Sequence, residues 1–252
     1  MADRRSRLRD LHGRTAAVWG GDDVRVEPGR WVALSGVRAV DFNIALLHDA
    51  SGGTAIPEVL EEIKSAGVPA LVMVTGAALG EVQQLVRASW VCVGAAAFMS
   101  LDLPNPGPEA ADAGVRRLER HEVARARELV AEVFGFAPEL AATAVPDETA
   151  DAPGRSVWGR FTPDGVLVST AATMVVEDVV AAWSVATPPA HRRQGHADAL
   201  LRGALAGAWA DGARRCLLNS SPEGEPLYRA LGFVELERWQ MWSRPRWVLS
   251  RF

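Results

Sequence analysis

The clearest pattern along the chain is an apolar stripe at helical spacing in its C-terminal half. Apolar positions recur there at i, i+3, i+4, i+7, i+8 and i+11, which is one face of an α-helix. These positions are Ala197, Leu200, Leu201, Ala204, Leu205 and Ala208. The helix is expected to end near Asp211 and Gly212, because glycine adopts the left-handed conformation that closes many helices.

Short apolar runs around this stripe predict strands. Three of them precede it with turn sequences between them, so an antiparallel meander is expected. These runs span residues 156–161, 166–176 and 179–187. A fourth run, at 215–219, follows the helix, and a strand, a crossover helix and a strand form a parallel unit. Further helices are predicted at 122–134, 138–144 and 225–231, and further strands at 115–119 and 233–242.

The N-terminal half repeats this order more weakly. It reads as strand, loop, helix, strand, helix and strand, over residues 42–48, 51–53, 57–66, 68–74, 79–86 and 90–98. Ala66-Gly67-Val68 also matches Asp211-Gly212-Ala213, from position 66 to position 211. Such self-similarity predicts two related halves. The alternative is chance, since any α/β chain can produce this order of elements.

A proline-rich segment separates the two halves. Residues 101–114 contain Pro104, Pro106 and Pro108, and proline both removes a backbone donor and disfavours helix at the preceding residue. We therefore divide the chain into an N-half, residues 1–110, and a C-half, residues 114–252.

Composition and charge exclude several classes of protein. With 48% apolar and 23% charged residues among 252, the chain is ordinary globular material. A net charge of −4 gives no field to hold nucleic acid or an anionic membrane. Without a membrane-length apolar run or a signal peptide, a cytoplasmic protein is predicted. Cys92 and Cys216 each lie in a strand-like apolar run and are expected to be buried thiols, with a disulfide as the alternative.

The loop at residues 187–197 carries the strongest candidate chemistry. It joins a predicted strand to the start of the predicted helix, where backbone N–H groups are free to bind an anion. Gly195 would allow close approach of phosphates, and Arg192 and Arg193 add positive charge to an acidic chain. The alternative is a solvated basic loop.

This loop and its neighbours resemble the GNAT acyltransferases. The loop fits the acetyl-CoA signature Q/R-x-x-G-x-G/A, with Arg192 first, Gly195 fourth and Ala197 sixth. Residues 183–187 with Pro189 resemble the family's fourth strand, and 217–221 its fifth. Residues 226–233 resemble its fourth helix and L-Y-x-x-L-G-F motif. The resemblance covers residues 114–244.

The resemblance implies a GNAT fold of the α/β (α+β) class. This is a mixed central sheet with flanking helices, whose fourth and fifth strands splay apart to admit the pantetheine arm of acetyl-CoA. The two halves would be tandem GNAT-like copies. Backbone N–H groups near the strand end would polarise the thioester carbonyl. The implied cofactor-binding residues are Val185, Ala186, Thr187, Arg192, Arg193, Gln194, Gly195, His196, Ala197 and Asn219.

Tyr228 matches the tyrosine with which this family protonates the leaving thiolate. A phenol with a pKa near 10 can donate its proton as the C–S bond breaks. The alternative is a packing tyrosine on a short helix. The general base stays open, because the strand carboxylate of many relatives is absent from residues 179–187. Glu177 and Asp178 suit a turn, His191 and His196 suit solvent-facing positions, and water relayed from strand backbone is the default.

The N-half lacks the cofactor signature. Its corresponding loop, residues 48–54, has glycines but no arginine pair, and Asp49 would repel a phosphate. We therefore expect a degenerate GNAT-like domain that shapes the acceptor cleft. Four tryptophans either line a wall of this cleft or fill the core: Trp183, Trp239, Trp242 and Trp247.

The resemblance predicts an N-acetyltransferase that uses acetyl-CoA and no metal. It would acetylate a primary amine of a small molecule or a peptide by direct attack in a ternary complex. A non-catalytic acyl-CoA-binding or regulatory module is the alternative, prompted by the missing carboxylate and the degenerate half. A third interpretation, acetylation of a basic chromatin or nucleoid protein, is not decided by a charge of −4. No nucleic-acid or membrane partner is expected, and the chain would be a monomer or a homodimer.

Overall fold

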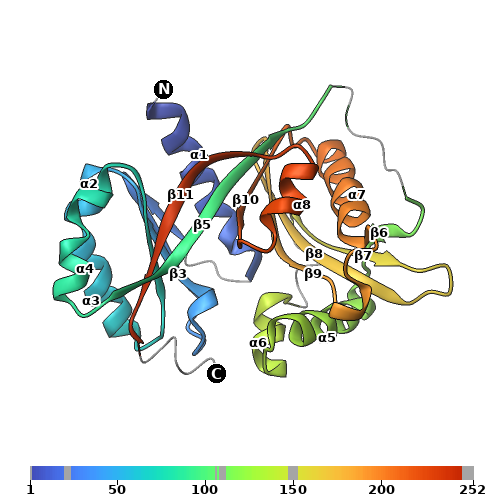
Figure 1. The fold of residues 1–252 in the computed structure, drawn as a ribbon, viewed down its shortest axis with the longest axis horizontal. Coiled ribbons are helices and arrows are strands. Elements are labelled where there is room, and N and C mark those ends of the chain that lie inside the picture. The colour runs from blue at the N-terminus through green and yellow to red at the C-terminus, as the bar shows by residue number, and fades with distance from the viewer. Residues whose placement is uncertain (1, 20–23, 106, 108–111, 147–152, 246–252) are drawn as a thin grey trace.

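The computed structural model describes residues 2–19, 24–105, 107, 112–146 and 153–245. Their strands form one mixed sheet of 11 strands, in the order β1-β2-β3-β4-β11-β5-β10-β9-β8-β7-β6 (Figure 1). The strands are β1 (Arg25–Glu27), β2 (Arg30–Leu34), β3 (Asn43–Leu47), β4 (Leu71–Val74), β5 (Val91–Asp102), β6 (Val115–Arg117), β7 (Arg155–Phe161), β8 (Leu167–Val176), β9 (Val179–Ala186), β10 (Arg215–Ser220) and β11 (Val234–Ser243).

Helices flank both faces of this sheet. The α-helices are α1 (Ala2–Thr15), α2 (Ala50–Thr54), α3 (Ile56–Ala66), α4 (Gln83–Arg87), α5 (Val123–Phe134), α6 (Pro138–Ala144), α7 (His196–Ala210) and α8 (Glu225–Ala230). Short 3₁₀ turns are η1 (Ala16–Trp19), η2 (Val40–Phe42), η3 (Gly76–Glu81), η4 (Arg120–Glu122) and η6 (Pro189–His191). The predicted α/β class with a mixed sheet and flanking helices is confirmed.

The local pattern of the C-half predicts its elements well. Strands β7, β8 and β9 form the expected antiparallel meander, and β10 returns parallel to β9 after the α7 crossover. The apolar stripe of α7 faces the sheet, where Leu200, Leu201 and Leu205 are at most 5% exposed. Burial of each leucine stabilises the fold by about 1.5–3 kcal/mol.

The two halves exchange their last strands. Strand β11 of the C-half lies between β4 and β5 of the N-half and is antiparallel to both. In the same way, β5 of the N-half is antiparallel to β10 of the C-half. Both halves therefore repeat a parallel strand pair, β3 with β4 and β9 with β10, extended by a strand from the other half. Figure 1 shows β5 and β11 running side by side through the middle of the molecule.

The N-half differs from its prediction at several points. Residues 51–53, expected to form a loop, lie in the short helix α2. The helix expected at 79–86 is divided between the 3₁₀ turn η3 and α4. The sequence pattern did not predict α1, β1 or β2. In α1 the buried positions Leu8, Leu11, His12 and Thr15 have helical spacing, but many arginines surround them and obscure it.

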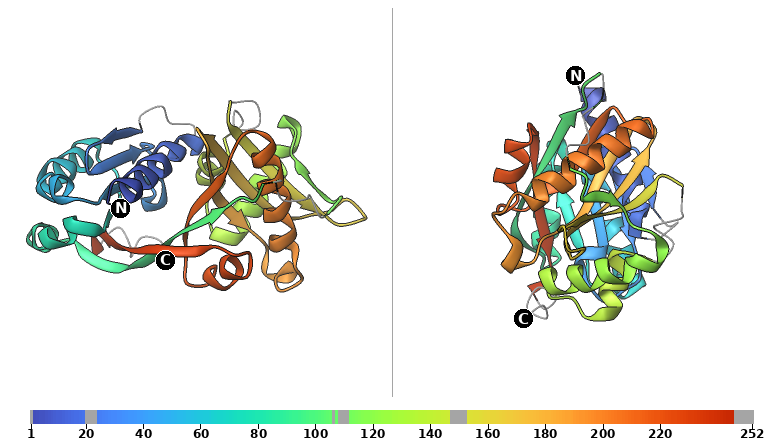
Figure 2. Two further views of the ribbon diagram at one scale, coloured as in Figure 1. Left: turned by 90° about the horizontal axis from the view of Figure 1, so that it is seen from above. Right: turned by 90° about the vertical axis from the view of Figure 1, so that its right-hand side faces the viewer.

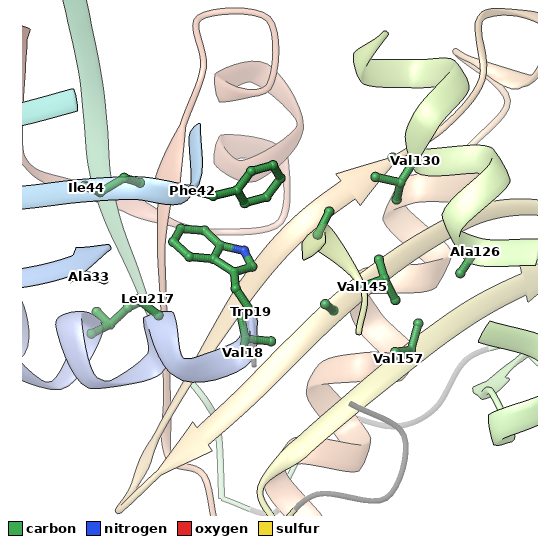
Figure 3. Close-up of a cluster of buried hydrophobic side chains, with 14 of the residues drawn as sticks. Val18, Trp19, Ala33, Phe42, Ile44, Ala126, Val130, Val145, Val157 and Leu217 are labelled. Carbon is green, nitrogen blue, oxygen red and sulfur yellow. The ribbon is translucent and has the colours of Figure 1, made fainter. Parts of the chain in front are cut away.

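The sheet has two covered faces where the halves meet. One apolar cluster joins α1, α5 and α6 to the sheet, and we call this the α1 face. Figure 3 shows part of it, with Trp19 and Phe42 near one another and Val130 and Val157 farther along the same cluster. A second cluster joins α7 and α8 to the opposite side, which we call the α7 face. In Figure 2 (left), α1 and α8 lie on opposite sides of β11.

One of the two cysteine predictions is wrong. Both thiols are free and both lie in strands, but Cys216 is buried while Cys92 is exposed. An apolar run is buried only where another element covers it, and the first residues of β5 are exposed, including Val91 and Val93. Within the described ranges, no helix combines the length and the apolar character that crossing a bilayer requires.

Candidate active site

The site begins where β9 and β10 part. Their parallel pairing covers only three registers and ends at Ala181 opposite Leu217. Beyond that point β9 continues along β8 to Ala186, and β10 continues along β5 to Ser220. The backbone edges of β9 and β10 that face each other are therefore no longer joined by ladder bonds. This is the divergence that the family resemblance implies, and we call it the splay.

A β-bulge in β9 sets which side chains face the splay. The register with β8 shifts between Thr170 and Ala172, and Ser184 has a φ of 50°. The bulge reverses the usual alternation of strand side chains. Trp183 packs on the α1 face, whereas Val185, only two residues later, packs on the α7 face. This bulge could not be predicted from the sequence, because serine is not a residue that marks left-handed backbone.

The loop after β9 is held by its own hydrogen bonds. The Ser169 hydroxyl lies 2.8 Å from the Thr187 hydroxyl, and Arg192 Nε donates to the Thr187 carbonyl at 3.0 Å. Gln194 Nε2 donates to the Ala190 carbonyl at 3.0 Å. Arg192 and Arg193 are both exposed; Arg192 uses its Nε within the loop, whereas Arg193 makes no hydrogen bond among those described.

Gly195 forms the N-cap of α7 in the left-handed conformation, with a φ of 79°. No side chain accepts a hydrogen bond from the first turn at this cap. A Cβ added at Gly195 would meet no atom within 4 Å, so the space over the helix start is open. The helix therefore offers its first N–H groups to an anion from outside. Burial, and then the positive charges of Arg160 and His191, lower the pKa of His196.

Tyr228 lies on the α7 face, within the apolar cluster of α7, α8 and β10. It is 8% exposed, and its ring packs at 5.6 Å from the ring of Phe233. Burial, and to a lesser extent Cys216, raises the pKa of the phenol. Tyr228 is therefore protonated at neutral pH, as any tyrosine is, and it holds its proton more firmly than an exposed phenol does.

Asn219 faces the other way. Its neighbours Leu218 and Ser220 follow the pleat to the α7 side, and Asn219 itself interacts with His12 of α1. The amide nitrogen of Asn219 is buried without a hydrogen-bond partner. Of these three predicted site residues, Val185 and Tyr228 therefore lie on the α7 face and Asn219 lies on the α1 face.

The carboxylates considered as a base are engaged elsewhere. Glu177 accepts hydrogen bonds from Arg14 at 2.5 Å and from Arg7 at 3.1 Å, and these cations lower its pKa. It lies in the turn before β9, at the opposite end of that strand from the cofactor loop. Asp178 shares the contact with Arg7. Neither carboxylate suits proton transfer at the splay.

Sequence reasoning missed His12, the residue that covers the splay from the α1 face. Its imidazole is fully buried and stacks on the Trp183 ring at 4.8 Å, with 18° between the planes. Neither ring nitrogen has a hydrogen-bond partner among the described residues. An unsatisfied buried polar group costs about 1–3 kcal/mol. Trp239 and Trp242 are buried in the core, and Trp247 lies outside the described residues.

Comparison with known proteins gives a family match for this region. Residues 158–235 match the model of the acetyltransferase (GNAT) domain, and no curated protein sequence gives a significant match. The described chain holds no cluster of three or more side chains suited to a metal ion.

Solved structures share the fold across most of the chain. A GCN5-related N-acetyltransferase from Kribbella flavida superimposes with a TM-score of 0.64 at 18% identity, over 95% of each chain. One from Sphaerobacter thermophilus gives 0.62 at 18% identity, over 86% of this chain and 78% of that one. The N-myristoyltransferase of Saccharomyces cerevisiae with bound myristoyl-CoA gives 0.53 at 11% identity, over 84% of this chain and 61% of that one.

Proposed function

We propose, on the premise that residues 158–235 are a GNAT acetyltransferase domain, that this protein transfers an acetyl group from acetyl-CoA to a primary amine of a small molecule or a peptide. The observation that carries the proposal is the parting of β9 and β10 beside the uncapped start of α7. Parted strands offer free backbone groups to an extended arm, and a helix start offers N–H groups to phosphates.

The cofactor loop would hold the pyrophosphate. No side chain caps the first turn of α7, and Arg193 lies exposed two residues before the N-cap Gly195. Val185 and Thr187 would bond the pantetheine arm through their backbone. The bound myristoyl-CoA of the yeast N-myristoyltransferase supports an acyl-CoA as the class of donor. We propose acetyl-CoA because the matched model describes acetyltransferases.

The reaction would be a single displacement with both substrates bound. Backbone N–H groups near Val185 to Thr187 would stabilise the negative charge that develops on the thioester oxygen. The amine nitrogen forms a bond to the acyl carbon and loses a proton, and the C–S bond breaks. Tyr228 would give its proton to the departing thiolate, because its position in the L-Y-x-x-L-G-F motif matches the family's proton donor.

Isothermal titration of the purified chain with acetyl-CoA tests the cofactor site first. We expect one site per chain. Turnover is then followed as release of free CoA thiol with a panel of acceptors: free lysine, an aliphatic diamine and a dipeptide with a free N-terminus. Because Cys92 is an exposed thiol, a protein-only blank must be subtracted.

The outcomes separate the two functions. Binding with release of CoA by at least one amine supports the transferase. Binding at one site with no turnover on any acceptor would favour the acyl-CoA-binding module. Failure to bind acetyl-CoA would remove both interpretations and leave the loop as a structural motif.

A further inference from the structure

Helix α1 belongs to the N-half by sequence but is fastened to the C-half. The guanidinium of Arg9 pairs with the carboxylate of Glu237 on β11 at 2.5 Å, with both side chains largely buried. Arg7 and Arg14 both bind Glu177 at the turn before β9. These ion pairs fasten α1 to two strands of the C-half, in addition to its packing on β2 of the N-half.

His12 is the polar residue that this helix brings to the splay. Trp183 and Asn219 each lie two residues beyond the last pair of β9 and β10, Ala181 with Leu217. They are therefore the first residues on the α1 face after the strands have parted, one from each strand. The His12 ring stacks on Trp183, and the Asn219 side chain lies near enough to act on the His12 pKa, although no hydrogen bond of good geometry joins the two.

Three buried polar atoms at this point lack a hydrogen-bond partner in the described chain. They are Nδ1 and Nε2 of His12 and Nδ2 of Asn219. Some indole N–H groups in the core, such as that of Trp31, also lack a partner. The polar atoms of His12 and Asn219 differ from these because they lie next to one another at the splay. Buried polar groups are nearly always satisfied in native proteins. A neutral imidazole has one acceptor nitrogen, so an amine that enters between the strands can donate a hydrogen bond to His12.

We propose that His12 and Asn219 receive the acceptor amine on the α1 face of the splay, and that His12 takes the proton which the amine loses as it attacks the thioester. This inference rests on the proposed function. The two faces would then divide the reaction, with the acceptor and its base on the α1 face and the thiolate and Tyr228 on the α7 face.

The protonation state of His12 fits this role. Burial lowers its pKa to about 4, against a smaller opposing effect of Asn219, so the imidazole is neutral at pH 7 and carries a free lone pair. Arg9, three residues earlier on the same helix, forms an ion pair with Glu237, so the charges of these two groups offset one another. The other neighbours are uncharged rings from β2, β5, β9 and β11: Trp31, Phe98, Trp183 and Trp239.

The protons balance over one turnover. The amine nitrogen loses one proton to His12 as the C–N bond forms, and Tyr228 gives one proton to sulfur as the C–S bond breaks. The histidinium, with its low pKa, then returns its proton to water, and the tyrosinate regains one. No further reactant is needed.

Two substitutions separate catalysis from packing. His12→Phe keeps an aromatic ring on Trp183 without a nitrogen, and His12→Gln keeps a polar group without a useful base. Both are expected to lower kcat by about 10²-fold or more, with the acceptor from the panel that wild type turns over fastest. Affinity for acetyl-CoA, measured by titration, is expected to stay within a factor of two or so. The control is His121→Gln, because His121 is an exposed histidine on η4 with its side chain 75% accessible.

The results are read together with the thermal unfolding of each variant. Turnover by His12→Phe at half the wild-type rate or more would overturn the proposal, since packing alone would then suffice. If His12→Phe does not fold, His12→Gln decides the question by the same criterion. Loss of acetyl-CoA binding in a folded His12 variant would also overturn it. Wild-type protein that turns over no acceptor would instead refute the proposed function.

Discussion

Each half contains a parallel strand pair with a helical crossover between its two strands, but the strands part in only one of the halves. In the C-half, β9 and β10 part after three registers, and α7 begins at Gly195 with no capping side chain. In the N-half, β3 and β4 pair along the full length of β4, from Leu71 to Val74. Thr75 N–H extends this pairing with a bond to the Leu47 carbonyl at 3.0 Å. The corresponding splay is closed.

The start of the helix in the N-half is also filled from within. The Asp49 carboxylate accepts hydrogen bonds from Gly52 N–H at 2.9 Å and from the Ser51 hydroxyl at 2.7 Å. The turn between β1 and β2 packs on this loop so tightly that Gly29 has no room for a Cβ beside Asp49. A carboxylate of the chain thus occupies the place that a phosphate would take in the C-half. The two halves therefore differ at the start of the helix: α7 has no capping side chain and can bind a ligand, whereas α2 is capped by Asp49 and serves as structural support.

The largest expected effect comes from closing the C-half in the way the N-half is closed. Arg193→Glu combined with Gly195→Glu places two carboxylates against the helix start. The loss of charge-assisted hydrogen bonds should weaken acetyl-CoA binding by about 10²- to 10⁴-fold in calorimetry.

A matched control separates the charge at the site from backbone strain. Gly212 lies beyond the other end of α7, also with positive φ and no atom within 4 Å of an added Cβ, and Arg87 is exposed on α4. Arg87→Glu combined with Gly212→Glu changes the net charge equally and should leave the affinity as it is. Equal weakening in both double variants would contradict the loop assignment.

A second test concerns Tyr228, which is the only tyrosine of the chain and therefore has no counterpart in the N-half. Tyr228→Phe preserves the contact with Phe233 and removes the acidic proton. We expect turnover to fall by about 10²-fold with unchanged acetyl-CoA affinity. Steady-state CoA release together with calorimetry measures both quantities. A variant with wild-type turnover would assign Tyr228 to packing.

A smaller effect is expected from opening the N-half. Asp49→Ala removes the N-cap of α2 and should lower the free energy of unfolding by about 1 kcal/mol in chemical denaturation. The stoichiometry of acetyl-CoA binding should remain one per chain, because β3 and β4 stay paired. A second binding site in Asp49→Ala would show that the cap alone separates the two halves.

The smallest effect is the pH dependence of this cap. Burial opposes ionisation of Asp49, but the hydrogen bonds from Gly52 and Ser51 and the nearby His48 together lower its pKa. A carboxylate with a lowered folded pKa stabilises the fold above its unfolded pKa, and this contribution is lost as pH falls through the folded value. The stability difference between wild type and Asp49→Ala should therefore shrink below about pH 4. A difference that is constant down to pH 3 would mean that the charge of Asp49 contributes nothing.

The extent of successful prediction follows the range of the interactions. The helix α7 with its glycine N-cap and the meander of β7 to β9 depend on local periodicity and turn residues, which a sequence displays directly. The strand exchange, the bulge at Ser184 and the placement of His12 depend on residues far apart in the chain. The prediction that Cys92 is buried was wrong for the same reason, because burial of a strand residue depends on which elements cover the strand. The roles of Tyr228 and of the loop residues, the oligomeric state, the cytoplasmic location and the domain division at 1–110 and 114–252 stay predictions.

The position of β11 also bears on the order in which a nascent chain can fold. β11 is the last strand to be synthesised among those described, yet it lies between β4 and β5, which are made more than a hundred residues earlier. Until residue 243 has left the ribosome, β4 and β5 each keep an unpaired edge, and such edges pair readily with other chains. Neither half can complete its sheet alone. The polypeptide should therefore gain its structure in one late cooperative step, and loss of the final strand would damage the first half of the molecule as much as the second.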